Sequence, residues 1–454
     1  MKRLRSILLT SFVLIMIAGV SSCRKSEIIL ENEIRVTDDS VTKDTIVWTK
    51  ENTYLLNGFV FINPGQVLKI EAGTIIKANT GQGENSSALI ISRGAKILAE
   101  GTMEEPIIFT VEGDDLEGSV PYTSRGLWGG LIILGDAPIN TANGEAKIEG
   151  IPISEPRGIY GGFDEKDNSG ILKYVSIRHG GTNIGKGNEI NGLTLGGVGN
   201  QTTIDHVEVI SNLDDGFEFF GGTVDCRYLV ASFCGDDAFD FDFGYQGRLQ
   251  HILALQRFSI GDHCAEHDGG EGPSFYEPYT IPKIANATFI GNSSDTSQHL
   301  ITFGHNGAGK YNNSIFYNQD KGISLEYNTN FFSSYYQLRE GNIAFKHNIF
   351  YEIANNQINS VAEFVFDVEE PDNQALSDLL MAITNHNNTI TEVELDITGE
   401  IFVINPGMNA YENLHSHSDS WFDNVDYKGA INPRNNADWL TGWTLLHQTG
   451  LIND

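Results

Sequence analysis

Two stretches of the chain repeat one another at a short interval. Residues 213–222 read LDDGFEFFGG, and residues 235–244, which begin 22 positions later, read GDDAFDFDFG. A repeat of this length is typical of solenoids, in which each repeat packs only on its neighbours. The feature constrains the fold because every copy must supply the same structural unit to one continuous stack.

Within the second copy, aromatic and acidic residues alternate. Phe239, Phe241 and Phe243 share one parity, whereas Asp240 and Asp242 share the other. A period of two predicts a strand, with phenylalanines toward a core and carboxylates toward water. Repeats of about two dozen residues suit coils of short strands joined by turns, with successive coils paired in parallel. The sequence therefore predicts an all-β parallel β-helix.

Composition is consistent with this fold and limits the partners. The 454 residues include 49 glycines and 12 prolines, which suits short strands joined by tight turns. A solenoid can extend over this length as one domain. The net charge of −31 argues against nucleic acid as a partner, because phosphate binding requires a basic surface. It is compatible with cations, with neutral sugars or with a solvated exterior.

The N-terminus reads as an export signal. MKRLR is basic, Ile7 to Val20 are apolar but too few for a confident membrane span, and Val20-Ser21-Ser22-Cys23 follows. This order resembles a bacterial lipobox, which implies that Cys23 is lipidated and becomes the new N-terminus. Residue 24 is Arg rather than the Asp typical of inner-membrane retention, so the resemblance implies the outer membrane. No pairing is predicted for the three remaining cysteines, Cys226, Cys234 and Cys264, and a buried thiol is expected for each.

Four regions follow from these patterns. They are a signal peptide (1–22), a lipidated N-terminus and flexible tether (23–45), the parallel β-helix (46–360), and an inserted helix with a C-terminal capping region (361–454). Residues 369–389, EEPDNQALSDLLMAITNHNNT, have helical spacing, with Asn373 or Ser377 as the expected N-cap. Trp421, Trp439 and Trp443 fit a cap better than a separate domain, since a solenoid must cover its last coil.

The acidic phrase has a third copy, GDHCAEHDGG, at residues 261–270. Stacking the three copies forms columns of carboxylates about 4.8 Å apart, which repel one another unless they are compensated. Calcium, protonation for sugar chemistry, or pairing with Arg227 or Arg248 would each compensate them. The candidate metal or ligand residues are Asp214, Asp215, Glu218, Asp236, Asp237, Asp240, Asp242, Asp262, Glu266 and Asp268.

The alternative interpretation of these acids is structural. Asp before Gly or a small residue is ordinary turn chemistry, which would explain Asp214, Asp215, Asp236 and Asp237. It explains the mid-strand acids less well, because Asp is disfavoured in strands.

The third copy also spells H-x-x-E-H. A zinc site of this kind requires a helix, whereas this segment is in register with two strands. The register also predicts that His267 faces inward.

A further candidate is an aromatic platform. Five aromatic residues lie among small polar residues, and exposed aromatic side chains commonly stack on sugars. They are Tyr327, Phe331, Phe332, Tyr335 and Tyr336. The alternative is that they cover the edge of the core.

Several longer phrases resemble known sequences. KIEAGTIIKA and KILAEGTMEEPIIFT are similar to the first coils of secreted bacterial right-handed β-helix proteins. WGGLIILGDAPIN, EINGLTLGGVG, the two acidic phrases and the ending WFDNVDYKGAINPRNNADWLTGWT resemble a group of surface lipoproteins from Bacteroidetes-type bacteria. The resemblance implies a right-handed parallel β-helix on the outer membrane and carries no catalytic residues.

The sequence leaves three functions open. The favoured one is a surface lipoprotein that binds a polysaccharide or similar ligand beside an uptake system. The second is a polysaccharide lyase or glycoside hydrolase on the same fold, and the third is a structural or adhesive surface protein.

Overall fold

The structure is a computed structural model that describes residues 32–185, 188–257, 260–270, 275–293, 297–329, 332–367, 369–435 and 438–453. The chain divides into residues 1–33 and a compact unit of residues 34–454. Among the described residues, no helix is both long enough and apolar enough to cross a membrane. Cys23 lies outside the described residues.

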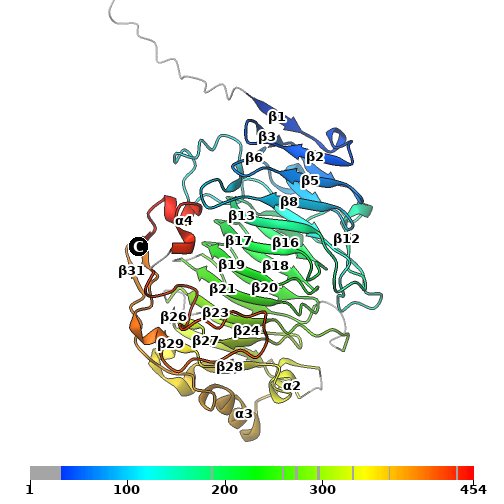
Figure 1. The fold of residues 1–454 in the computed structure, drawn as a ribbon. Helices are drawn as coiled ribbons and strands as arrows, with labels where there is room; N and C mark the ends of the chain where they lie inside the picture. Colours follow the sequence, from blue (N-terminus) through cyan, green and yellow to red (C-terminus); the bar gives the residue numbers. More distant parts are fainter. Residues whose placement is uncertain are drawn as a thin grey trace, which may run out of the picture. The chain divides into compact units, whose positions relative to one another are not determined.

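One face of the solenoid is a ten-stranded parallel sheet, here called sheet B. Each strand contributes a few residues and pairs with the equivalent strand of the next coil (Figure 1). In spatial order the strands are β4 (Phe59–Ile62), β7 (Ala88–Ile91), β10 (Leu131–Leu134), β16 (Leu193–Gly196), β18 (Phe217–Phe220), β20 (Phe239–Asp242), β22 (Ala265–His267), β24 (His299–Phe303), β27 (Lys321–Glu326) and β30 (Ala362–Val365).

The remaining coil strands form a sixteen-stranded sheet, sheet A, which bends through a corner. Its first coils use two short strands each: β1 (Glu33–Val36), β2 (Thr45–Trp48), β3 (Thr53–Leu56), β5 (Val67–Ile70), β6 (Ile75–Ala78), β8 (Lys96–Glu100) and β9 (Ile107–Val111). Its middle coils use one long strand each: β13 (Gly170–Arg178), β17 (Thr203–Ile210), β19 (Cys226–Ser232), β21 (Arg248–Leu255) and β23 (Lys283–Ile290). Its last coils return to short strands: β25 (Lys310–Asn312), β26 (Ile315–Gln319), β28 (Ala344–Lys346) and β29 (Ile349–Ile353).

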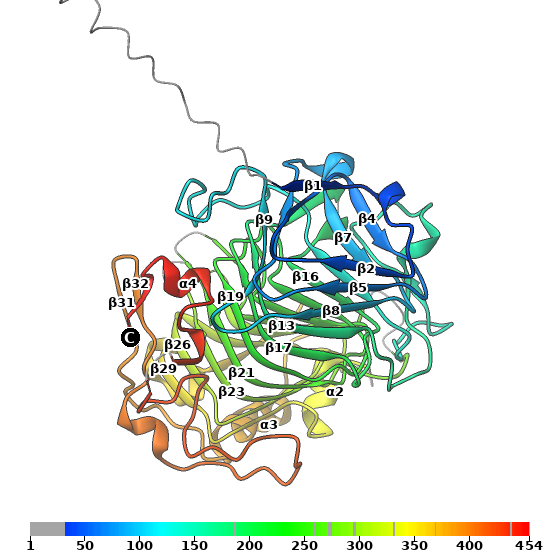
Figure 2. The ribbon, with the colours of Figure 1, turned by 45° about the horizontal axis from the view of Figure 1, so that its top comes forward.

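The corner of sheet A is made by single residues in the left-handed conformation. The first half of β13 pairs with β8 and its second half pairs with β9. Tyr174, between the two halves, has φ 48°, and its equivalent in β17, His206, has φ 55°. A positive φ turns the strand without ending it, so sheet A continues around two sides of the coil (Figure 2).

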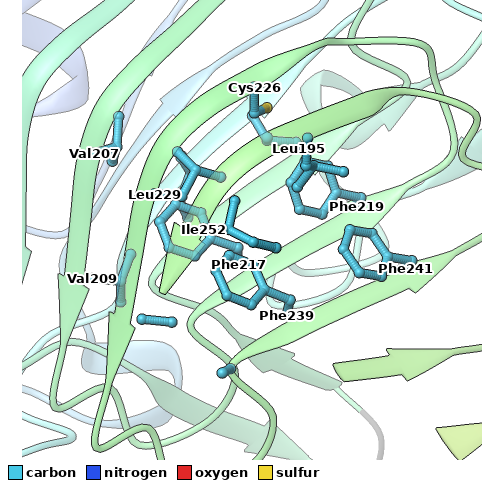
Figure 3. Close-up of a cluster of buried hydrophobic side chains, with 14 of the residues drawn as sticks. Leu195, Val207, Val209, Phe217, Phe219, Cys226, Leu229, Phe239, Phe241 and Ile252 are labelled. Carbon is cyan, nitrogen blue, oxygen red and sulfur yellow. The ribbon is translucent and has the colours of Figure 1, made fainter. Parts of the chain in front are cut away.

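The interior between the sheets is a ladder of apolar side chains. Phe217 stacks on Phe239 with ring centroids 5.2 Å apart, and Phe219 stacks on Phe241 at 5.1 Å. Figure 3 shows these rings beside the inward side chains of β17 and β19. Strands β18 and β20 pair directly, with Glu218 opposite Asp240, so the predicted register of the two acidic phrases is confirmed. The predicted fold class, an all-β parallel β-helix, is also confirmed.

One detail of the predicted alternation is wrong. Phe243, expected to face the core with Phe239 and Phe241, instead packs on Phe220 in a separate cluster outside the coil. Its φ of 49° reverses the direction of the side chain just after β20 ends.

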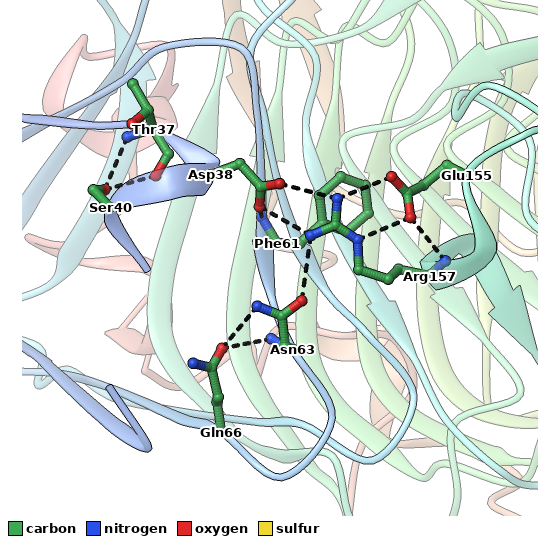
Figure 4. A network of polar contacts seen from close by, with 8 residues as sticks. All are labelled: Thr37, Asp38, Ser40, Phe61, Asn63, Gln66, Glu155 and Arg157. Atoms are coloured by element: carbon green, nitrogen blue, oxygen red, sulfur yellow. Dashed lines mark hydrogen bonds and ion pairs between the residues drawn. The ribbon is translucent and has the colours of Figure 1, made fainter. Parts of the chain in front are cut away.

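Arg157 joins the first coils to a lateral segment. Arg157 donates to Asp38, Glu155 and Asn63, and its guanidinium lies 3.8 Å from the ring centroid of Phe61 (Figure 4). The lateral segment, residues 136–169, carries the short pair β11 (Ala146–Lys147) and β12 (Ile159–Tyr160). A second lateral pair is β14 (Thr182–Gly185) and β15 (Asn188–Ile190). Strand β1 and the 3-10 helix η1 (Asp38–Ser40) fall within residues 23–45, which were assigned from sequence to the tether.

The chain ends in a capping segment. Helix α3 (Asn373–Thr384) lies within residues 369–389, so the predicted helix is present. It contacts a second helix, α2 (Ser334–Arg339). The N-cap of α3 is Asp372, whose carboxylate accepts from the Ala375 N–H at 2.8 Å, rather than Asn373 or Ser377. The rest of the segment includes β31 (Asp396–Thr398), β32 (Ile401–Val403), α4 (Leu445–Gln448) and β33 (Ile452–Asn453). It packs on the outer face of sheet A and buries Trp439 and Trp443 in a second apolar cluster.

Candidate functional site

A single row of side chains runs along the outer face of sheet B, one from each strand. Strand pairing aligns Phe61, Ile90, Ile132, Thr194, Glu218, Asp240, Glu266, Thr302, Ser324 and Glu363. Along this outer row, three apolar side chains are followed by Thr194, three acids, two further hydroxyls and a final acid, Glu363. Its chemistry therefore varies from coil to coil although its geometry repeats.

The apolar part of the outer row is covered. Ile148 and Ile151 of the lateral segment, together with Ile190, pack over Ile90 and Ile132. The burial of these side chains removes the upper part of sheet B from solvent. A site on this sheet must consequently lie over the acidic and hydroxyl parts of the row.

Glu218, the first acid of the row, is buried rather than facing water as predicted. It is only 7% exposed, because Asn191 and Glu149 lie over it. Asn191 donates to one oxygen of Glu218, and a hydrogen bond joins the Glu218 and Glu149 carboxyl groups. Burial raises the pKa of Glu218 well above its usual value and raises the pKa of Glu149 to about 7. The pair consequently holds a proton near neutral pH.

A second carboxyl pair lies two coils further on. The Asp237 and Glu266 carboxyl groups are hydrogen-bonded, which requires that one of them be protonated. Burial raises the pKa of both, and Asp237 is 2% exposed. Asp240 lies between the pairs, and its pKa is raised by burial and by Glu266. The Asp240 Oδ1 atom is buried and accepts no hydrogen bond from the described residues.

Two of the acids have a structural role as well. The Asp215 carboxylate accepts the backbone N–H of Asp237 at 2.8 Å, and the Asp237 carboxylate accepts the backbone N–H of His263 at 2.6 Å. Asn191 begins this ladder by accepting from the Asp215 N–H at 3.3 Å. The turn interpretation of Asp215 and Asp237 is thus supported in a specific form, in which each side chain binds the backbone of the next coil.

The other acids flank the row. Asp214, Asp236 and Asp262 occupy successive turns that are joined by backbone hydrogen bonds. Burial, with the Asp236 charge as the next cause, raises the pKa of Asp214 to about 8. At the other end of the strands, Asp242 follows Phe241, and the backbone N–H of Asp268 bonds the Phe241 carbonyl.

The ion pairs of these acids are with histidines. His263 lies 3.1 Å from Asp237 and 3.3 Å from Asp262, and His305 donates to Asp268 at 2.7 Å. The suggested arginine partners are wrong. Arg227 pairs with Asp423, and Arg248 pairs with Asp225 and Asp419, all outside the acidic columns.

These acids offer the oxygen ligands that a hard cation requires. Two sets, Asp215 with Glu218 and Asp240, and Asp237 with Asp240 and Glu266, each bring carboxylate oxygens within 4.8 Å of one another. Calcium prefers several oxygen ligands of this kind. Asp240 belongs to both sets, and its Oδ1 atom accepts no hydrogen bond from the described residues, so these residues fit such an ion.

Beyond Glu266 the outer row opens into a groove. The groove has a volume of about 890 Å³. Its floor includes the side chains of His299, Thr302 and Ser324, and the Thr302 and Ser324 hydroxyls are hydrogen-bonded at 2.5 Å. Val365 and Phe366 form an apolar wall and are 48% and 43% exposed. His263 lies at the end of the groove toward the acids.

The described residues of the predicted aromatic platform do not share one exposed surface. Tyr327 and Tyr335 are buried in the main core and pack on one another at 5.1 Å. Phe332 is exposed, Tyr336 is half-buried, and Phe331 lies outside the described residues. The alternative, that these rings cover the edge of the core, describes Tyr327 and Tyr335. The exposed ring that lines the groove is Phe366.

His267 and the three cysteines are internal. His267 stacks between Phe241 and Phe303, as its register predicted, and burial lowers its pKa to about 3. It lies in strand β22, not in a helix, so the H-x-x-E-H spelling is incidental. Cys226, Cys234 and Cys264 are buried free thiols.

Several residues of the site were missed from sequence: Asn191, Thr194, Glu149, His299, Thr302, Ser324 and Phe366. Asn191 and Thr194 carry a detectable signal, because Asn191-Gly192-Leu193-Thr194-Leu195 repeats the pattern of residues 215–219, DGFEF. Glu149 has no such signal, since it reaches the row from the lateral segment.

The fold and the groove together define a parallel β-helix protein with an open groove along one sheet. The chain belongs to the pectate-lyase-like β-helix domain family, whose model matches residues 40–444. No curated protein matches the sequence.

Two solved structures are similar at low identity. The Dettilon tailspike protein is 11% identical over 71% of this chain and 62% of its own, with a TM-score of 0.28. Tailspike protein 2 from the Escherichia coli O157:H7 bacteriophage CAB120 is 10% identical over 77% of this chain and 44% of its own, with a TM-score of 0.22. This chain thus spans less than two thirds of either tailspike.

Proposed function

We propose that the protein binds a polysaccharide in the groove on sheet B. The observation that carries the proposal is the pairing of a polar floor with an exposed apolar wall. Thr302 and Ser324 present hydroxyls, and Phe366 presents a ring on which a sugar can stack. The groove is open and follows a repeating sheet, which suits an extended chain ligand. Membership of the pectate-lyase-like family supports the same class of ligand.

A glycan array with the purified mature protein tests this function. Phe366→Ala should abolish or strongly weaken binding, because it removes the stacking surface. Leu376→Ala is the matched control, since Leu376 is 49% exposed on α3 and is not a groove residue. Equal binding by both variants, or no glycan bound by the wild type, would contradict the proposal.

Calcium bound among Asp237, Asp240 and Glu266 is part of the same proposal. It would neutralise carboxylates at the end of the groove and leave the floor available for a sugar. When bound, the ion supplies positive charge to oxygen-rich ligands. The protein residues orient it through the ladder that fixes Asp237.

A second candidate function is glycoside hydrolysis. The specific observation in its favour is that Asp240 and Glu266 are neighbours in the outer row, that burial raises the pKa of both, and that Glu266 adjoins the groove. A protonated and an ionised carboxyl group are the acid and base that glycosidases use. Release of shortened or reducing-end products from a bound glycan distinguishes this function from binding alone.

We also propose an outer-membrane lipoprotein, in the manner of the Bacteroidetes-type surface lipoproteins that the sequence resembles, working beside an uptake system. The support is the ordered signal ending in Val20-Ser21-Ser22-Cys23. Metabolic labelling with a fatty-acid analogue should mark the wild type and not Cys23→Ser. Label retained by the variant would exclude lipidation at Cys23.

A further inference from the structure

The groove is lined by negative charge. Its described lining residues include the carboxylates of Glu326, Asp367 and Glu369 and include neither lysine nor arginine. The acidic part of the outer row continues from its end, because Glu266 pairs in register with Thr302 on the groove floor. A ligand in the groove thus experiences a negative potential along its length.

The histidines of the groove are already engaged by carboxylates. His299 bonds Glu363 at 2.6 Å, and burial lowers its pKa. His263 lies between Asp237 and Asp262. Neither ring is therefore available as a counter-charge for an anionic sugar without giving up an existing contact.

Glu326 carries an unsatisfied acceptor. Its Oε2 atom is buried and accepts no hydrogen bond from the described residues, although Glu326 lines the groove. A buried carboxylate oxygen without a donor is costly, and a charged donor is the group that compensates it best. The nearby wall of Val365 and Phe366 would hold the ring that carries this donor.

We propose that the ligand is a polysaccharide with primary amines, that is, one containing hexosamine units, and that Glu326 binds an ammonium group. This inference rests on the proposed function and names its substrate class. A uronate polymer would place its carboxylates against those of the groove, and like charges at such distances repel. A neutral sugar would stack on the wall but would leave the Glu326 oxygen without a charged donor.

Isothermal titration of the full mature chain in EDTA tests the inference with three oligosaccharides of equal length: glucosamine, N-acetylglucosamine and galacturonate oligomers. The glucosamine oligomer should bind roughly 10-fold or more tightly than its N-acetylated counterpart, the effect of one charge-assisted hydrogen bond. The galacturonate oligomer should bind most weakly. Raising NaCl from 50 to 500 mM, both chosen concentrations, should shrink the advantage of the amine.

Two variants distinguish the loss of one negative charge in the groove from a general loss of folding. Glu326→Gln preserves shape and should remove most of the glucosamine advantage while N-acetylated binding is retained. Glu340→Gln, an exposed acid outside the groove, should change neither. Equal affinity for all three oligomers, or a preference for galacturonate, overturns this inference but leaves saccharide binding intact. Failure of all saccharides, including those of the array, overturns the proposed function itself.

Discussion

The Asp237 carboxylate accepts the backbone N–H of His263, one coil further along, at 2.6 Å. The same side chain is hydrogen-bonded to Glu266, which precedes the groove in the outer row. One buried acid therefore holds two coils together and orients a residue of the candidate site. Each copy of the acidic phrase continues a ladder of hydrogen bonds from a carboxylate to the backbone of the next coil. The other acids of the phrase are brought into columns as a consequence.

The ladder predicts a difference between two substitutions of Asp237. Asp237→Ala leaves the His263 N–H without its acceptor and should lower the free energy of unfolding by about 1–3 kcal/mol. Asp237→Asn retains a carbonyl oxygen and should lower it less. Urea denaturation followed by circular dichroism measures both. Equal losses would show that charge, and not the backbone hydrogen bond, makes Asp237 important.

Much of the fold was predictable because the signals are local. Alternation places Phe239 and Phe241 inside, and the repeat fixes Glu218 opposite Asp240. The burial of Glu218 was not predictable, since Glu149 reaches it from a lateral segment remote in sequence. The groove could not be predicted for a related reason. Thr302 and Ser324 belong to coils that no longer repeat the acidic phrase, so their alignment is visible only from the strand pairing.

The protonated acids predict a pH dependence of stability. The pKa of Asp214 is raised to about 8, whereas an unfolded Asp titrates near 3.9. The folded state thus binds the proton more tightly, and stability from this group is lost as pH rises from about 4 to about 8. Asp214→Asn should gain stability relative to the wild type over this interval, by at most about 1.4 kcal/mol per pH unit.

The measurement is the difference in Tm between the wild type and Asp214→Asn from pH 5 to pH 8.5, chosen values, in EDTA. The difference is needed because two buried histidines also make stability depend on pH. Burial lowers the pKa of His251 and His267 to about 3, so their contribution to stability increases as pH rises toward 6.5. Glu117→Gln, at an exposed acid remote in sequence from the acidic phrases, serves as the control. A difference that stays constant across this range would contradict a raised pKa for Asp214.

Calcium should stabilise the folded protein if it binds among the acids. Calcium at 100 times its Kd adds about 2.7 kcal/mol to the free energy of unfolding, which raises the Tm. Asp240→Asn should abolish the rise, since Asp240 belongs to both carboxylate sets. In EDTA the same variant should be more stable than the wild type, because one of several like charges is removed.

Protons and calcium should also compete for the same oxygens. The Tm rise on adding calcium should be larger at pH 8 than at pH 5, both chosen values, because burial raises the pKa of Asp237 and Glu266. Magnesium, which demands tighter octahedral geometry, is the matched control ion. An unchanged Tm in calcium, with a stabilised Asp240→Asn and unaltered glycan binding, would leave the acids a structural role alone.

The stacked core predicts two contrasting phenylalanine variants. Phe241 is fully buried between Phe219 and His267, so Phe241→Ala should cost about 3–5 kcal/mol. Phe243 lies two residues further on and is only partly buried outside the coil, so Phe243→Ala should cost clearly less. Urea midpoints compare them. Similar costs would contradict the reversal of side-chain direction at Phe243.

One buried carboxylate on sheet A, that of Glu208, binds the end of the C-terminal segment. Glu208 is fully buried and accepts the N–H groups of Leu445 and Leu446, at 2.8 and 3.0 Å, where α4 begins. It also accepts the Ser176 hydroxyl, which in turn accepts from the buried Arg178. Removal of the Glu208 carboxylate leaves these buried donors without an acceptor. It also leaves the buried Arg178 guanidinium further from any negative charge.

Glu208→Ala should therefore cost about 3–5 kcal/mol and make the segment after residue 438 accessible to protease before the β-helix unfolds. Asp423→Ala is the matched control, because Asp423 pairs with Arg227 at the surface and a pair of this kind contributes about 0–1 kcal/mol. Glycan binding should survive in Glu208→Ala at temperatures where the coils remain folded, since Glu208 lies on sheet A and the groove lies on sheet B. Loss of binding without unfolding would show that the C-terminal segment and the groove are coupled.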